Sequence, residues 1–166
     1  PLHFAGFKTG WDLGFAGFEW GLDSLVGPGD AGPLTFQSKL GHSFTDEFAL
    51  SVGVANIALT DADRAGDPFT YLVAAYDFEW VRLHAGYGLQ TGGNTVLLGL
   101  DRNFEVFDRT LNLNTDLVQI RDGDGWMTSV GAKYVLHDAI VLETWANLPD
   151  EGSASFIAKI NFVFTF

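Results

Sequence analysis

Large apolar residues and small or polar residues alternate with a period of two through most of the chain, which is the pattern of β-strands with two different faces. Segment 48–57 shows it clearly in the two interleaved series Phe48, Leu50, Val52, Val54 and Ala49, Ser51, Gly53, Ala55. The same alternation predicts ten strands, at residues 12–25, 34–43, 48–57, 69–78, 80–89, 95–102, 110–120, 126–136, 140–148 and 153–166. Residues 1–11 follow no clean period, so they form either a lead-in or an extra strand.

The connections between these strands fall into two alternating kinds. Short turns are expected near residues 45, 78, 105 and 138, and more polar loops near residues 28, 63, 92, 123 and 151. Segment 27–33 is predicted as a loop because its glycines and prolines are poor members of a strand ladder. In segment 110–120, Val118 and Ile120 break phase, which predicts a bulge. Eight or twelve strands are the alternative counts.

The final strand carries a specific signal, since alternate apolar residues lead to an aromatic chain end at Phe162, Phe164 and Phe166. This pattern resembles the C-terminal assembly signal of bacterial outer-membrane β-barrel proteins. Segments 34–57 and 70–89 are generally similar to small porin-like members of that class. The resemblance implies a bacterial outer-membrane location, with the lipid bilayer, lipopolysaccharide and the outer-membrane assembly machinery as partners.

Length and composition fit this interpretation. The 166 residues suit a single domain, and charges or glycines interrupt every apolar run, so a membrane could be crossed only by strands. Predicted strands of roughly 9 to 13 residues with alternately short and long connections are typical of outer-membrane barrels. The expected fold is therefore an all-β, transmembrane, antiparallel up-and-down β-barrel. There is no Cys.

Alternation alone does not orient the barrel, because a soluble lipocalin-like barrel has the same period with its apolar face inside. The less apolar face decides the choice here. It carries many small residues, among them Ser51, Gly53, Gly86 and Gly88. Such residues make a poor solvated surface but suit a crowded interior. We therefore expect the large apolar face to meet lipid and the small, charged face to line the lumen.

Charge divides by position under this orientation. The predicted lumen-lining residues combine four acids, four bases and one histidine: Glu19, Lys39, Arg82, His84, Asp101, Asp116, Lys133, Glu143 and Lys159. The outer loops are acidic, with Asp23, Asp30, Asp61, Asp63, Asp67, Asp122, Asp124, Asp150 and Glu151 against Arg64 and Arg121. This rim holds much of the formal net charge of −12. A balanced lumen predicts ion pairs, because unpaired charges of one sign are costly to bury.

Two functions follow from this arrangement. In the first, small solutes or ions pass passively through a narrow, charge-balanced lumen, with the acidic rim concentrating cations. In the alternative, the same side chains close the barrel, and the protein is a structural or partner-binding scaffold in the outer membrane. Permeability of protein-containing liposomes separates the two.

Catalysis, metal binding and cofactors receive little support from the sequence. His42 and His137 fall near the short turns and His84 within a strand, away from the acidic rim, and His3 lies in the ambiguous first segment. His84 is predicted to belong to the lumen network. The Asp-rich loops lack the remaining ligands of a calcium loop, so polar turns are predicted there. No cofactor motif or basic nucleic-acid surface is present.

Aromatic residues near the ends of the predicted strands are expected to form an interfacial girdle. The candidates are Trp20, Trp80, Trp126, Trp145, Tyr71 and Tyr87, although Trp80 and Trp145 share the phase of the inward residues.

Overall fold

The computed structural model describes residues 3–27, 30–91, 93–120 and 125–162, and this part of the chain is an all-β sheet of eleven strands. The described residues form no helix, and hence none that is long and apolar enough to span a membrane. The strands are β1 (His3–Asp12), β2 (Gly17–Gly27), β3 (Asp30–Ser43), β4 (Phe48–Ala58), β5 (Phe69–Asp77), β6 (Arg82–Gln90), β7 (Gly93–Val106), β8 (Arg109–Ile120), β9 (Gly125–His137), β10 (Ile140–Pro149) and β11 (Ser155–Phe162).

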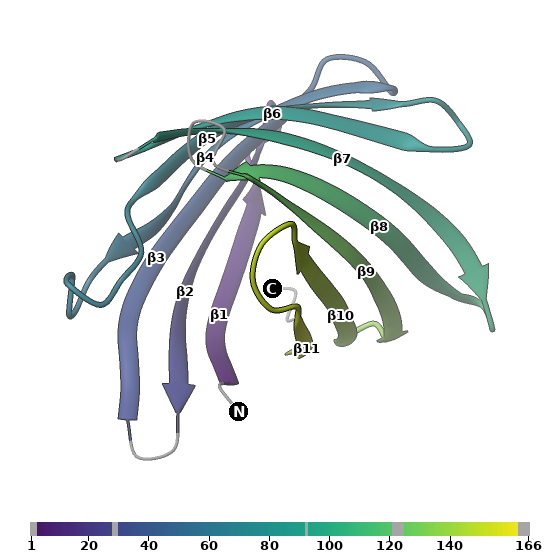
Figure 1. Ribbon diagram of the computed structural model, residues 1–166. Helices are drawn as coiled ribbons and strands as arrows, with labels where there is room; N and C mark the ends of the chain where they lie inside the picture. Colours follow the sequence, from purple (N-terminus) through teal and green to yellow (C-terminus); the bar gives the residue numbers. More distant parts are fainter. Residues whose placement is uncertain (1–2, 28–29, 92, 121–124, 163–166) are drawn as a thin grey trace.

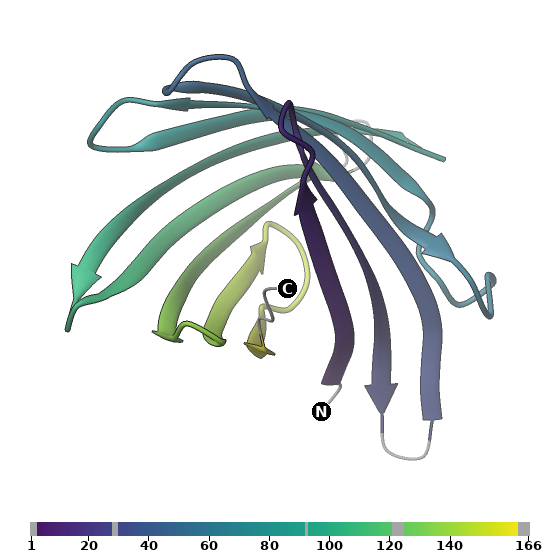
Figure 2. The same ribbon diagram turned by 180° about the vertical axis from the view of Figure 1, so that it is seen from behind.

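Each strand pairs antiparallel with the next one in the chain, so the sheet order is the chain order from β1 to β11. The predicted all-β, up-and-down topology is thereby confirmed. The sheet curls into a half-barrel, with β1–β3 on one side, β5–β7 across the crest and β8–β10 on the other side (Figures 1 and 2). Within the described ranges, β1 and β11 are the two edges of the sheet and do not pair with each other.

The strand count differs from the predicted ten because the ambiguous first segment is itself a strand. β1 pairs with β2 along its whole length, from His3 opposite Val26 to Asp12 opposite Gly17. The predicted first strand, 12–25, therefore starts too early, since residues 13–16 turn between β1 and β2. That turn is closed by the Leu13 N–H, which donates to the Ala16 carbonyl at 2.9 Å.

In the predicted loop 27–33, Gly27 and residues 30–33 are instead strand, and residues 28–29 lie outside the described residues. The ladder between β2 and β3 runs on to Gly27 opposite Asp30, with a register shift between Ser24 and Val26. Pro33 lies on the strand opposite this shift, where the regular ladder is interrupted and its missing N–H is tolerated. The shift explains why a proline here does not end the strand.

Two further predictions concern β7 and β8. The short turn predicted near residue 105 is present, but it is only two residues long, because Phe104 and Leu111 still pair and the chain reverses at Phe107 and Asp108, both with positive φ. The predicted bulge in 110–120 is absent, since both registers of β8 are continuous. Val118 faces the same side as its register partner Leu97, so the phase change is a local apolar pair on the less apolar face.

The sheet has almost no apolar core. Among the described residues, Ala16 and Val141 are the buried apolar ones, whereas Thr95, Asp101 and Ser129 are buried polar ones. Every large apolar side chain that is exposed and lies in a described strand is on a single face of the sheet. The exposed large apolar side chains of the described strands therefore form one apolar surface of the sheet.

Candidate functional site

The candidate site is the polar face of the sheet, and strand register brings its residues together. Antiparallel partners lie on the same face, so the chain of partners Glu19, Lys39, Gly53 and Tyr71 defines one row across β2 to β5. The same reasoning places all nine residues predicted to line the lumen on this face: Glu19, Lys39, Arg82, His84, Asp101, Asp116, Lys133, Glu143 and Lys159.

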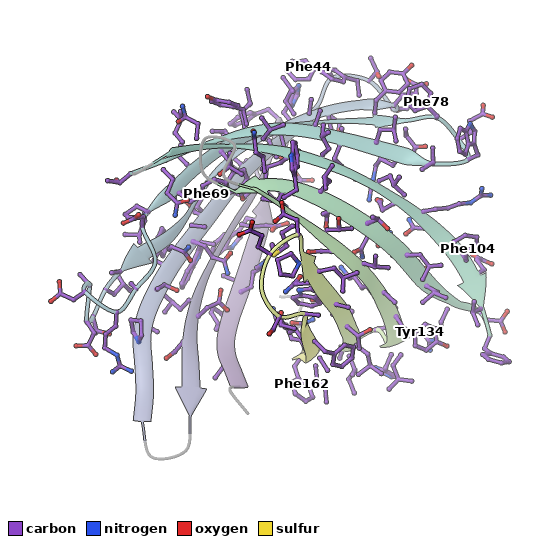
Figure 3. All side chains as sticks on the ribbon, in the orientation of Figure 1. Phe44, Phe69, Phe78, Phe104, Tyr134 and Phe162 are labelled. Carbon is purple, nitrogen blue, oxygen red and sulfur yellow. The ribbon has the colours of Figure 1, made fainter. Side chains whose placement is uncertain are left out.

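This polar face is the concave one. A recess on it is lined by residues from β1, β2, β3 and β5, including Lys8, Glu19 and Tyr71, which only the inside of a curl can bring together. The buried polar residues belong to the same face, whereas outward residues such as Val130 and Phe162 are 48% and 66% exposed. Figure 3 shows side chains on both sides of the curled ribbon, with Phe162 at the lower end of the sheet.

The first charged group lies on β1 to β3. Lys39 Nζ is 3.2 Å from Glu19 Oε2, and the two side chains are 41% and 43% exposed. Next to them, the Gln37 side-chain amide donates to Asp23 Oδ2. Asp23 was predicted to lie in an outer loop, but it lies in β2 opposite Gly6 and Thr35 and faces inward. This correction adds an acid to the concave face.

The second group lies at the crest, on β6 and β7. Arg82 contacts both carboxylate oxygens of Asp101, with Nη2 at 2.7 Å and Nε at 3.0 Å. His84 Nε2 is 3.3 Å from Asp101 Oδ2. The Asp101 side chain is only 8% exposed, whereas Arg82 remains 44% exposed. A planar guanidinium thus satisfies a buried carboxylate and still reaches the open side of the sheet.

The third group lies on β8 to β11 around a second recess of about 300 Å³. Lys133 Nζ and Glu143 Oε1 are 3.9 Å apart, and Glu143 is also the register partner of Lys159. Neutral groups form two short chains beside them. The Asn114 amide donates to Asn112 and the Asn112 amide to Asn103, while Ser129 donates to Asn147 and Asn147 donates to Ser155.

Glycines make room for the large side chains of this face. A Cβ on Gly53 would collide with the Tyr71 ring and would lie 2.7 Å from the Ser38 carbonyl oxygen. A Cβ on Gly88 would collide with the ring of Phe69, which stacks on Tyr71 with centroids 5.6 Å apart. The inward aromatic rings therefore pack directly against the backbone at these glycines.

The residues predicted to form an interfacial aromatic girdle lie on both faces of the sheet and in one turn. Tyr71 was expected in the interfacial girdle, but its register partners Gly53 and Gly88 place it on the concave face. Trp145 lies there as well, as its phase indicated, and Trp80 lies in the turn after β5. Trp20, Trp126 and Tyr87 lie on the outward face.

Lys8 is a further charge on the concave face that was not predicted. Lys8 lies opposite Gly21 on β1, and its neighbours on the same face are Gly6 and Gly10. The signal was present, because Lys8 alternates with the apolar Phe7 and the small Thr9. Gly6 and Gly10, which carry no hydropathy signal, obscure the period around it.

The connections that carry the predicted acidic rim all lead from an even-numbered strand to an odd-numbered one. In an antiparallel sheet in chain order, such connections lie at the same end of the sheet. Asp61, Asp63 and Asp67 lie in the connection from β4 to β5, and Asp150 and Glu151 follow β10. Asp150 accepts backbone N–H groups from Trp126 and Glu151, at 3.0 and 2.9 Å. Asp122 and Asp124 lie outside the described residues, as does the side chain of Asp30.

His42 is the penultimate residue of β3 and His137 is the last residue of β9, so both lie next to short turns, at the end of the sheet opposite these acids. Nowhere in the described ranges do three or more metal-ligating side chains gather to hold a metal ion. Of the terminal aromatic residues, Phe162 closes β11 on the apolar face, and Phe164 and Phe166 lie outside the described residues.

No protein-family model, curated protein or solved structure matches the chain.

Proposed function

We propose that the protein is an integral outer-membrane β-barrel through which small solutes or ions pass passively along the polar face. The observation that carries the proposal is the inverted distribution of side chains. Large apolar residues cover the convex face, and buried Asp101, Ser129 and Thr95 lie on the concave face. In water, an apolar surface of this extent has no favourable partner, whereas lipid chains supply one.

The ion pairs of the concave face favour an open lumen over a plugged one. The inter-strand pairs Glu19–Lys39, Arg82–Asp101 and Lys133–Glu143 each join neighbouring strands, so the charged groups neutralise one another along the wall. A plug needs side chains that reach across the interior and meet others from distant strands. The bases of these pairs remain 41% to 50% exposed, which suits contact with water and passing solutes.

A bilayer sets one further requirement, which concerns the two edges of the sheet. Backbone groups at an open edge have no partners in hydrocarbon, so β1 and β11 have to be covered in the membrane. Both strands have odd numbers in an up-and-down sheet and therefore run in the same direction. If β1 paired directly with β11, the two strands would be parallel. A barrel closed by antiparallel pairs alone needs one additional strand between them.

Reconstitution tests the proposed passage directly. Purified protein in planar bilayers is expected to give ohmic channels, with a reversal potential in a KCl gradient that indicates preference for K⁺. The triple substitution Asp61→Asn, Asp63→Asn and Asp67→Asn lowers that preference, because it removes negative charge from the rim. Inserted protein that gives no conductance above that of empty membranes contradicts the pore and supports the scaffold alternative.

A further inference from the structure

We propose that the recess between β8 and β10 is a binding site for a neutral, hydroxyl-rich solute of the sugar class. The inference rests on the proposed function, because it assigns a preferred solute to the same concave face. The recess has a volume of about 300 Å³ and is lined mainly by Asn114, Asp116, Ser129, Lys133, Glu143 and Trp145. A volume of this order accommodates one or two sugar rings.

The first element of the site is the indole ring of Trp145, whose neighbour on β9 has no side chain. Trp145 is a large aromatic residue on the concave face, and its register partner on β9 is Gly131, which adds no side chain. The position of a Cβ on Gly131 is instead occupied by the amide oxygen of Asn114. The site therefore combines the indole of Trp145 on β10 with the amide of Asn114 on β8, on either side of β9. The C–H face of a sugar ring packs on an indole, whose π-face is electron-rich.

The polar groups supply both donors and acceptors. Lys133 donates, the carboxylates of Asp116 and Glu143 accept, and the Asn114 amide does both. Hydroxyl groups need this mixture, because each one donates and accepts. The Lys133–Glu143 separation of 3.9 Å is longer than a direct hydrogen bond, so each group can engage a third partner between them.

Charge selects a neutral solute over an ion. Lys133 and Glu143 offset each other, and Lys159, the register partner of Glu143 on β11, places a second ammonium group beside that carboxylate. An anion in the recess would meet the carboxylates of Asp116 and Glu143, and a cation would meet the ammonium group of Lys133, with that of Lys159 on the next strand. A neutral polyol avoids both penalties and uses every group in the recess.

Calorimetric titration tests the assignment, with the protein in an amine-oxide detergent that carries no sugar headgroup. The probes are sucrose, choline as an organic cation and succinate as a dicarboxylate. Saturable binding of sucrose with a dissociation constant on the order of 1 mM is expected, with choline and succinate at least about tenfold weaker. Trp145→Ala should weaken sucrose binding about tenfold or more, and Trp145→Phe less, because it keeps an aromatic face.

Trp126→Phe is the matched control, because Trp126 lies on β9 but faces outward, and it should leave sucrose affinity unchanged. Equal or tighter binding of choline or succinate, absence of saturable sucrose binding, or an unaltered affinity in Trp145→Ala would each overturn the assignment. Conductance measured without sugar reports separately on the pore. Channels without sucrose binding refute this inference alone, whereas sucrose binding by inserted protein without channels refutes the pore and retains the site.

Discussion

Asp101 shows how individual residues hold the concave face together. Its carboxylate is almost fully buried and receives both Arg82 nitrogens as well as His84. A buried carboxylate is stable only while such partners remain. Removing a partner is destabilising mainly because it leaves the charge of Asp101 buried and unpaired. Exposed pairs such as Arg109–Asp138, in which Asp138 is 86% exposed, lack this dependence because water replaces the lost partner.

Arg82→Ala should therefore lower the free energy of unfolding by about 3 kcal/mol, since it leaves Asp101 unpaired in a buried position. Arg109→Ala is the matched control and should cost less than about 1 kcal/mol. Urea titration of the protein in lipid vesicles, followed by tryptophan fluorescence, measures both. An equal loss in the free energy of unfolding for the two variants would contradict the view that burial of Asp101 makes its pair with Arg82 important for stability.

Gly53 provides a second test at this scale. Gly53→Ala should destabilise the sheet by roughly 1–3 kcal/mol, because the added methyl group meets both the Tyr71 ring and the Ser38 carbonyl oxygen. Gly17→Ala is the control, since its nearest neighbour is 4.0 Å from the added Cβ, and it should be neutral or stabilising. The same urea titration compares the two. A Gly53→Ala variant as stable as Gly17→Ala would mean that Tyr71 does not lie over Gly53.

Strands are the scale at which sequence was most informative. Alternation predicted the face of every residue named for the lumen, because a period of two follows from backbone geometry alone. It failed where other factors decide: the ladder continues past Pro33 through a register shift, and β1 is obscured by glycines that carry no hydropathy signal. The recess between β8 and β10 was not predictable, because it depends on register among three strands.

Leu97 and Leu98 are adjacent in β7 but lie on opposite faces, so the two Lys variants compare the faces directly. Leu98→Lys should cost about 2–4 kcal/mol in vesicles, because it places an amine in hydrocarbon. Leu97→Lys should cost clearly less, because its amine reaches the polar interior. Urea titration in vesicles measures both, and the reverse order would indicate that the convex face is in water.

At the scale of the whole molecule, the described residues form an open curl whose edges are β1 and β11. Outer-membrane insertion requires these edges to be covered, whichever partner strand covers them. Curvature brings charges from distant parts of the chain onto one wall, and this arrangement gives the proposed lumen its balance. Closure could not be predicted from the sequence, because alternation describes the faces of each strand and not which strand lies beside it.

Hydrogen exchange followed by mass spectrometry tests this closure. In vesicles, peptides from β1 and β11 should exchange as slowly as those from β6, an interior strand, because all their amides are paired. Edge peptides that exchange as fast as the loop at residues 59–68, while β6 stays protected, would contradict a closed barrel.

The central claim is that the convex face meets lipid and the concave face meets water. The natural chain has no Cys, so single cysteines at positions 83, 84, 97 and 98 can carry nitroxide labels without interference. In vesicles, spin relaxation should show that labels at Leu83 and Leu98 are accessible to oxygen, which concentrates in lipid. Labels at His84 and Leu97 should instead be accessible to a water-soluble nickel chelate. Nickel accessibility at Leu83 and Leu98, with oxygen accessibility at His84 and Leu97, would contradict the account.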